Sequence, residues 1–450
     1  MSDLETIEYE DLSEQQKAVH ALIEAGENVF IQGSAGSGKS TYIKYLQDTS
    51  IKSIALCSST GVSALNIGGM TLHSFFRLPI SDIIDEESLF KQKRRGLSKL
   101  LRGLELLVID EVSMVRPDML DAIDLLCKKL RHDKRPFGGI QMVLIGDVYQ
   151  LPPVITKASE ELFIKKYGTS DVYFFDSDAY KDGNFKMVEF SKTYRQQDED
   201  LLENLNNIKN KTNLASAISY FNSCKFTRQA QFDFSIILTP YRKNADFINQ
   251  NKLNELTTKE KTYEAKLSGT FINAKESNYP VQKSLRLKEN ALIMFTKNNG
   301  ALWVNGSLGV ISELNERTIK VKLLSTGETV TVVPETWEDK KYTTSTTLKM
   351  NEETYEMEKK DIIVEEVVGT FRQFPLQLGY AITIHKAQGK TLDLVSIDLG
   401  RGAFTHGQLY VALSRTRHKK DINVISPIRI RDAIISDRIQ KFMSDSVRNK

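Results

Sequence analysis

The chain has 450 residues, which is long enough for more than one core, and its 40% of hydrophobic and 26% of charged residues are typical of a globular protein. No apolar run is long enough to cross a bilayer, and the acidic N-terminal stretch lacks the apolar segment of a secretion signal. We therefore expect a cytoplasmic protein without membrane contact. The net charge of +3 permits nucleic-acid binding without arguing for it. The scattered Cys57, Cys127 and Cys224 indicate reduced thiols.

Short apolar runs alternate with helical stretches in the first half of the chain. Four runs end in a Gly, Ser or Asp turn, as buried parallel strands do: residues 28–33, 53–59, 104–110 and 141–147. Between the last two, residues 117–131 place apolar side chains at helical spacing, which predicts a helix packed on a sheet. Functional residues of such a sheet follow the carboxyl ends of its strands.

A second series of strand-like runs begins near residues 186–190 and continues through 234–240, 394–399 and 422–426. Two segments interrupt the pattern. The polar segment 76–103 includes KQKRR, and residues 300–370 alternate Thr and Val between Gly turns, as antiparallel strands do. We therefore predict an α/β protein with two parallel-sheet domains. The predicted boundaries are 1–75 with 104–190 for the first domain, 76–103 for its insertion, 191–300 with 371–450 for the second domain, and 301–370 for its β insertion.

The segment Gly33 to Ser40 fits the phosphate-binding pattern GxxxxGK[ST]. Its glycines let backbone N–H groups surround phosphate oxygens, and the following helix presents its positive end. Lys39 is expected to reach the β and γ phosphates, and Ser40 to ligate Mg²⁺. The predicted nucleotide contacts from this segment are Gly33, Gly36, Ser37, Gly38, Lys39, Ser40 and Thr41.

Polar side chains follow two further strands. Asp110 and Glu111 end an apolar run, and such a pair suits one carboxylate holding Mg²⁺ while the other acts as a base. Asp147 and Gln150 follow the next run. Gln150 either senses the γ phosphate or belongs to an ordinary strand exit, and both interpretations remain open from the residues alone.

Taken in order, these stretches resemble the Pif1-like helicases, which belong to the 5′-to-3′ branch of superfamily 1. The similarity is most specific over Asp110 to Val154, which includes PFGGIQ at residues 136–141. Other stretches that resemble family motifs are LSEQQKAV (12–19), STGVSALNIGGMTLHSFF (59–76), FSKTYRQ (190–196), AITIHKAQGKTLD (381–393) and GQLYVALSRTR (407–417). Lys390 and Thr391 differ from several family members.

The resemblance implies two RecA-like domains with ATP between them. It assigns Gln16 to the adenine, Tyr194 to stacking near the base, and Gln388 and Gly389 to the nucleotide site. It also implies that Arg195 and Arg415 reach the γ phosphate from the second domain. The catalytic set is then Lys39, Glu111, Gln150, Arg195 and Arg415, with ATP as substrate and Mg²⁺ held by Ser40 and Asp110.

The resemblance further implies contacts to single-stranded DNA, from Thr60, His73, Ser74 and Phe75 in the first domain and from Thr383, His385, Lys386 and Gln388 in the second. Phe75 alternatively belongs to the core. The first insertion would be a wedge or pin, with KQKRR either holding displaced phosphates or forming a solvated loop. The second would be an SH3-like subdomain closing over the strand, in which Trp303 and Trp337 are packing residues first and DNA contacts second.

The implied activity is that of a monomeric, ATP-dependent 5′-to-3′ DNA helicase that acts on single strands and junctions and associates further on DNA. The resemblance also implies association with the nucleoid if the source is bacterial. Duplex forks, G-quadruplexes and RNA–DNA hybrids are alternative substrates, and repair, recombination and telomere maintenance are the family's pathways. A competing interpretation is a DNA-stimulated ATPase that grips a strand without unwinding it. A small-molecule kinase fits less well, because it would not need two arginines far from the phosphate loop.

Overall fold

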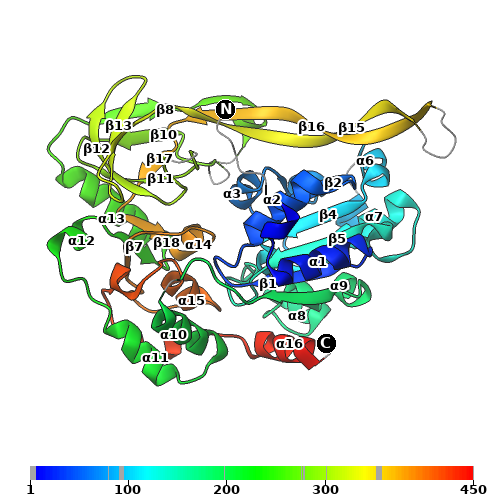
Figure 1. The fold of residues 1–450 in the computed structure, drawn as a ribbon, viewed down its shortest axis with the longest axis horizontal. Coiled ribbons are helices and arrows are strands. Elements are labelled where there is room, and N and C mark those ends of the chain that lie inside the picture. Colours follow the sequence, from blue (N-terminus) through cyan, green and yellow to red (C-terminus); the bar gives the residue numbers. More distant parts are fainter. Residues whose placement is uncertain are drawn as a thin grey trace.

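The computed structural model of the protein describes residues 7–79, 81–90, 96–196, 198–274, 276, 279–299, 302–350 and 357–448. Two lobes lie side by side, and a long β-hairpin runs from the second lobe across the first (Figure 1). Among the described helices, none combines the length and apolar composition needed to span a membrane.

The first lobe contains a six-stranded parallel sheet with the order β3-β2-β4-β5-β1-β6. Its strands are β1 (Val29–Gly33), β2 (Ile54–Ser58), β3 (Met70–Thr71), β4 (Leu106–Asp110), β5 (Gln141–Gly146) and β6 (Lys186–Phe190). Its helices are α1 (Glu14–Glu24), α2 (Lys39–Thr49), α3 (Gly61–Asn66), α4 (Leu72–Phe76), α5 (Glu86–Phe90), α6 (Leu97–Gly103), α7 (Pro117–Arg131), α8 (Glu160–Tyr167) and α9 (Asp178–Asp182). The four strands predicted in this half of the chain and the helix at 117–131 are confirmed.

The run at 186–190 was predicted to begin the second series of strands, although it lies inside the boundary 104–190 predicted for the first domain. Residues 186–190 do not begin the second series, because β6 pairs in parallel with β1 and closes the first sheet, with Val188 opposite Ile31. The apolar pattern of this segment indicates a strand but carries no information about its partner, which lies more than a hundred residues away. The first sheet therefore ends where the chain leaves for the second lobe.

The second lobe contains a four-stranded parallel sheet with the order β18-β7-β19-β20. The strands are β7 (Ile236–Thr239), β18 (Ala381–Thr383), β19 (Val395–Ile397) and β20 (Ile422–Val424). Three of them match predicted runs, and β18 was not among these. The helices of this lobe are α10 (Glu199–Asn210), α11 (Leu214–Asn222), α12 (Gln229–Asp233), α13 (Arg242–Glu255), α14 (Ile384–Ala387) and α15 (Gln408–Leu413).

Antiparallel strands form the upper part of the second lobe (Figure 1). They are β8 (Lys261–Glu264), β9 (Lys266–Gly269), β10 (Ser284–Leu287), β11 (Leu292–Phe295), β12 (Leu308–Leu314), β13 (Ile319–Leu323), β14 (Thr329–Val332), β15 (Glu335–Met350), β16 (Met357–Gln373) and β17 (Leu376–Leu378). Five of them make one sheet, β14-β13-β12-β11-β17, and the hairpin β15-β16 pairs with β9. The antiparallel region thus starts before residue 301 and ends after residue 370. Trp303 and Trp337 are buried in it, as packing residues are.

The insertion at 76–103 contains the short helices α5 and α6, and Leu97 and Leu101 of α6 are buried in the core of the first lobe. The KQKRR run at 91–95 lies outside the described residues.

The C-terminal helix α16 (Asp437–Arg448) returns to the first lobe and lies beneath it (Figure 1). The ring of Phe442 stacks on Phe175 with centroids 4.1 Å apart and an interplanar angle of 7°. Arg438 forms an ion pair with Asp176, and the Ser436 hydroxyl donates to Asp171 at 2.7 Å. The chain therefore connects the two lobes a second time at its C-terminal end.

Candidate functional site

The loop between β1 and α2 forms the phosphate cradle. Gly36 and Gly38 have φ angles of 80° and 85°, in the left-handed region that favours glycine. A Cβ atom on Gly36 would lie 2.3 Å from the Cβ of Arg195, so the segment that carries this arginine touches the loop backbone. The loop accommodates Arg195 only because residue 36 has no side chain.

Gly36→Ala is expected to weaken ATP binding roughly 10- to 100-fold, because overpacking typically costs about 1–3 kcal/mol and ~1.4 kcal/mol is tenfold in affinity. Titration with a fluorescent ATP analogue measures this. Gly26→Ala is the matched control, since Gly26 has a φ of 81° but nothing lies within 4 Å of its Cβ position. The control shares the backbone strain and should bind ATP normally. Equal affinities for the two variants would contradict the clash.

Lys39 begins α2 and points back into the loop. Its Nζ donates to the carbonyl oxygens of Gly33 at 2.5 Å and Ser34 at 2.9 Å. Burial lowers the pKa of Lys39, and the charge of Asp147 opposes that shift. A phosphate oxygen is a stronger partner for a desolvated ammonium than a carbonyl is, because both groups are then charged. The geometry thus suits the predicted phosphate contact.

Gln16 and Tyr194 meet at the outer side of the loop. Gln16 Nε2 donates to the carbonyl oxygen of Gly38 at 3.3 Å, and a Cβ on Gly38 would lie 3.5 Å from a ring carbon of Tyr194. The Tyr194 side chain is 52% exposed, while its backbone N–H donates to the Gly36 carbonyl at 2.8 Å. The two residues predicted to contact the base are therefore neighbours.

Arg195 was predicted to arrive from the second domain, and this prediction is wrong. It lies on the segment that follows β6 of the first sheet, and Tyr194 ties this segment to the phosphate loop. The chain passes over the loop before it enters the second lobe. Burial, followed by the charge of Arg415, lowers the pKa of Arg195 to about 9.

The guanidinium of Arg195 bridges the lobes by long contacts. It donates to the carbonyl oxygens of Ser414 and Gly389, each at 3.5 Å. Its Nε is buried and has no hydrogen-bond partner among the described residues. An anion between the lobes would accept a hydrogen bond from this Nε atom.

Arg415 does come from the second lobe and is fully buried. It donates to the carbonyl oxygens of Val411 at 2.7 Å and Ala387 at 3.2 Å, and to the Ser414 hydroxyl at 2.6 Å. Burial lowers its pKa to about 10. Arg415 therefore holds the loop after α14 in addition to its predicted catalytic role.

The acidic pair lies at the carboxyl end of β4, as predicted. Burial, followed by the charge of Glu111, raises the pKa of Asp110 to about 7. Glu111 has a φ of 51°, and its Oε2 accepts a 3.0 Å hydrogen bond from Nε2 of Gln388 in the second lobe. Gln388 Oε1 is buried and has no partner among the described residues. The candidate base is thus joined directly to the other lobe.

The sequence did not reveal how Asp147 takes part in the site. Its buried carboxylate accepts hydrogen bonds from Gln32 at 2.9 Å and Gln150 at 3.0 Å in the first lobe. The hydroxyl of Tyr410, in the second lobe, lies 3.4 Å from the oxygen that Gln150 contacts. Asp147 therefore orients Gln150 and touches both lobes. An acidic residue after an apolar strand was the available signal, but its partners are distant in sequence.

Ser40 and Asp110 are the residues that would hold Mg²⁺. No cluster of three His, Cys, Asp or Glu side chains suited to a metal occurs in the described part of the chain. Mg²⁺ usually binds one or two protein oxygens, with phosphates and waters completing its coordination. The hydroxyl of Ser40 and the buried carboxyl of Asp110 fit that requirement.

In both lobes, predicted DNA contacts lie at short helices whose N-terminus is capped by a threonine. Thr60 accepts from Ser63 N at 3.2 Å to cap α3, and Thr383 accepts from Lys386 N at 3.3 Å to cap α14. Sequence reasoning missed Thr71, which caps α4 in the same way. The segments TLHS at 71–74 and TIHK at 383–386 share this form, one in each lobe. Burial lowers the pKa of His73 and of His385.

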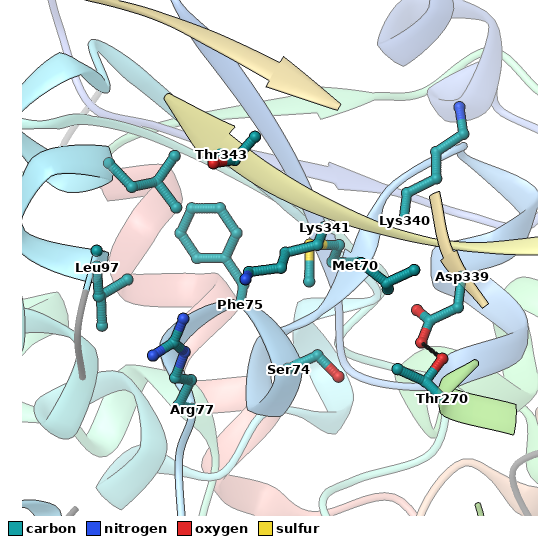
Figure 2. A pocket seen from close by; sticks show the side chains of 13 residues that line it. Met70, Ser74, Phe75, Arg77, Leu97, Thr270, Asp339, Lys340, Lys341 and Thr343 are labelled. Carbon is teal, nitrogen blue, oxygen red and sulfur yellow. Dashed lines mark hydrogen bonds between the residues drawn. The ribbon is translucent and has the colours of Figure 1, made fainter. Parts of the chain in front are cut away.

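A cavity of about 320 Å³ lies between α4 and α6 of the first lobe and the hairpin strand β15 (Figure 2). Ser74, Phe75 and Arg77 line one side, and Lys340 and Lys341 line the other. Phe75 is buried and packs edge-on against Phe76 with centroids 4.8 Å apart. The cavity combines an apolar wall with cations from both lobes, a composition suited to nucleic acid.

The model of the PIF1-like helicase family matches residues 11–226. ATP-dependent DNA helicase Pif1 of Psychrobacter sp. is 31% identical over 90% of this chain and 66% of its own length, so the chain spans about two thirds of that relative. Pif1 of Campylobacter jejuni is 31% identical over 94% of each chain. The crystal structure of Bacteroides sp. Pif1 with ADP-AlF4 superposes with a TM-score of 0.86 at 33% identity over 97% of each chain. Bacteroides Pif1 bound to single-stranded DNA gives 0.68 at 34% identity over 96% of each chain.

Proposed function

The chain belongs to the Pif1-like family of ATP-dependent DNA helicases, and we propose that it moves 5′-to-3′ along single-stranded DNA and separates the duplex ahead of it. The observation that carries this proposal is the contact between Gln388 in the second lobe and Glu111 in the first, at 3.0 Å. A hydrolytic base held by the other lobe makes turnover depend on how the lobes are placed. Closure on ATP and reopening after hydrolysis then provide the mechanical step.

Each side chain at the interface has a distinct role in this proposal. Lys39 binds the β and γ phosphates, and Glu111 accepts a proton from the attacking water. Arg195 and Arg415 neutralise the charge that develops on the γ phosphate. Gln150, oriented by Asp147, positions the water. When bound, Mg²⁺ would neutralise phosphate charge.

We propose that the protein moves along DNA because both lobes carry similar groups that can contact a strand. Thr60 with Thr71 and Thr383 with Lys386 offer hydroxyl, backbone and cationic contacts of the sequence-independent kind. The relatives bound to single-stranded and forked DNA support this choice. One chain supplies the nucleotide residues described above, which supports a monomer as the working unit.

A strand-displacement assay tests the direction and the substrate. Duplexes with a 5′ tail, a 3′ tail or no tail are mixed with protein, ATP and Mg²⁺, and ATP hydrolysis is followed with and without single-stranded DNA. We expect stimulation of hydrolysis by single strands and unwinding of the 5′-tailed duplex alone. Unwinding restricted to 3′ tails would reverse the direction. Stimulation without unwinding would favour an ATPase that only grips DNA. Forks, G-quadruplexes and RNA–DNA hybrids in the same assay rank the substrates.

A further inference from the structure

The loop that follows α14 has two faces, and only one of them serves the nucleotide site. On that face Gln388 donates to Glu111, and the guanidinium of Arg415 donates to the carbonyl oxygens of Ala387 and Lys390 at 3.2 and 3.3 Å. The side chain of Lys390 leaves from the other face. None of the helicase roles assigned above involves the Lys390 side chain.

The Lys390 ammonium donates to the side-chain oxygen of Asn305, in the turn between β11 and β12 of the five-stranded sheet. Burial lowers the pKa of Lys390 to about 8. A desolvated ammonium depends strongly on the partner that it has, because it has lost its water. The buried Lys390 ammonium therefore depends on its hydrogen bond to Asn305.

A second observation shows that the same two segments are fitted to each other. Gly306 has a φ of 104°, and a Cβ atom on it would lie 2.5 Å from the carbonyl oxygen of Thr391. Two hydrogen bonds hold Asn305 and Gly306 against the end of β11, because Asn305 N donates to the Asn298 side chain at 2.7 Å and Gly306 N donates to the Phe295 carbonyl at 2.9 Å. Backbone approach and side-chain bond thus join the loop after α14 to the five-stranded sheet.

We propose that Lys390 is a positioning residue that couples the placement of the five-stranded sheet to the contact between Gln388 and Glu111. Gln388 lies two residues before Lys390, so a shift of the turn at Asn305 moves the loop that carries Gln388. The proposal rests on the proposed function, since it makes this contact one route by which DNA bound under the antiparallel strands stimulates hydrolysis. Lys390 acts through Gln388 and does not touch ATP.

Lys390→Met in the full chain tests the proposal, because methionine keeps most of the length and removes the donor. We expect hydrolysis at saturating single-stranded DNA to fall roughly two- to thirtyfold, the usual range for coupling changes. The rate without DNA and the KM for ATP should stay as in the natural protein. Lys390→Arg keeps a charged donor and should retain most of the stimulation. Asn305→Leu should reproduce the loss, and the double variant should lose no more than either single one.

The outcomes separate this inference from the function it rests on. If the natural protein shows no stimulation by single-stranded DNA, the proposed function fails and the variants are not needed. If the natural protein is stimulated and Lys390→Met is stimulated equally, the coupling role fails alone. Equal loss with and without DNA, or additive losses in the double variant, would also overturn it, because either result indicates general damage to the site.

Discussion

Glu111→Gln is expected to lower ATP hydrolysis by on the order of 10³-fold while ATP still binds, because a general base typically contributes 10²–10⁴-fold. Glutamine has the same shape as glutamate but cannot accept the proton from water. Its amide oxygen can still accept the hydrogen bond that Gln388 donates to Glu111 Oε2 at 3.0 Å. The variant should therefore close on ATP and stay closed. Steady-state hydrolysis and equilibrium binding of an ATP analogue, both with single-stranded DNA, measure the two properties.

Glu105→Gln is the matched control for this change. Glu105 directly precedes the strand β4 that ends at Asp110, and its Oε2 accepts from Ser53 N at 2.7 Å. It lies at the amino end of the strand, remote from the phosphate loop. The control should hydrolyse ATP like the natural protein. Full hydrolysis by Glu111→Gln would mean that another group is the base.

Arg195→Ala is expected to lower the DNA-stimulated rate by on the order of 10³-fold, the lower end of the effect of arginine fingers. Its effect on stability should be small, because among the described residues the Arg195 guanidinium donates only two hydrogen bonds, each of 3.5 Å, and its Nε has no partner there. Arg415→Ala should lose activity to a similar extent and also lower the melting temperature. Removing Arg415 breaks the hydrogen bonds that its buried guanidinium donates to the carbonyl oxygens of Val411 and Ala387, and a hydrogen bond to a charged group typically contributes about 1.5–3 kcal/mol.

Hydrolysis and thermal unfolding, measured on both variants, distinguish the two arginines. Arg286→Ala provides the control, since this arginine pairs with Glu260 at 2.8 Å within the antiparallel region. It should leave the rate unchanged. A large loss of stability in Arg195→Ala, or an unchanged rate, would show that Arg195 is a structural bridge.

The local conformation of the phosphate loop and the position of the acidic pair at a strand end could be predicted from the sequence, whereas the contacts between distant segments could not. The phosphate loop follows from Gly36, Gly38 and Lys39, because the conformation needs those residue types within one short stretch. The pair Asp110–Glu111 follows from the apolar run before it. The partner of Glu111 is Gln388, 277 positions away, and the residues themselves carry no sign of that contact.

The same limit explains the errors. Residues 186–190 form a strand as predicted, but which sheet they join depends on an edge of β1 that the chain reaches much earlier. Arg195 follows that strand, and starting the second domain at residue 191 misplaced the origin of the arginine, since Tyr194 ties this segment to the phosphate loop of the first lobe. Asp147 received no role of its own from the residues, because Gln32 and Tyr410, two of the described side chains that contact it, are remote in sequence.

The C-terminal helix has a mechanical consequence. Two rigid bodies joined at one point can rotate about three axes. A second, separate joint leaves rotation only about the line that passes through both joints. The segment after β6 provides the first joint, and α16, seated on Phe175 and Asp176, provides the second. The hairpin β15-β16 lies at the opposite side of the molecule from α16 (Figure 1). Once the hydrogen bonds at the nucleotide site are released, rotation about that line would give a short arc at the nucleotide, beside the first joint, and a longer arc near the hairpin.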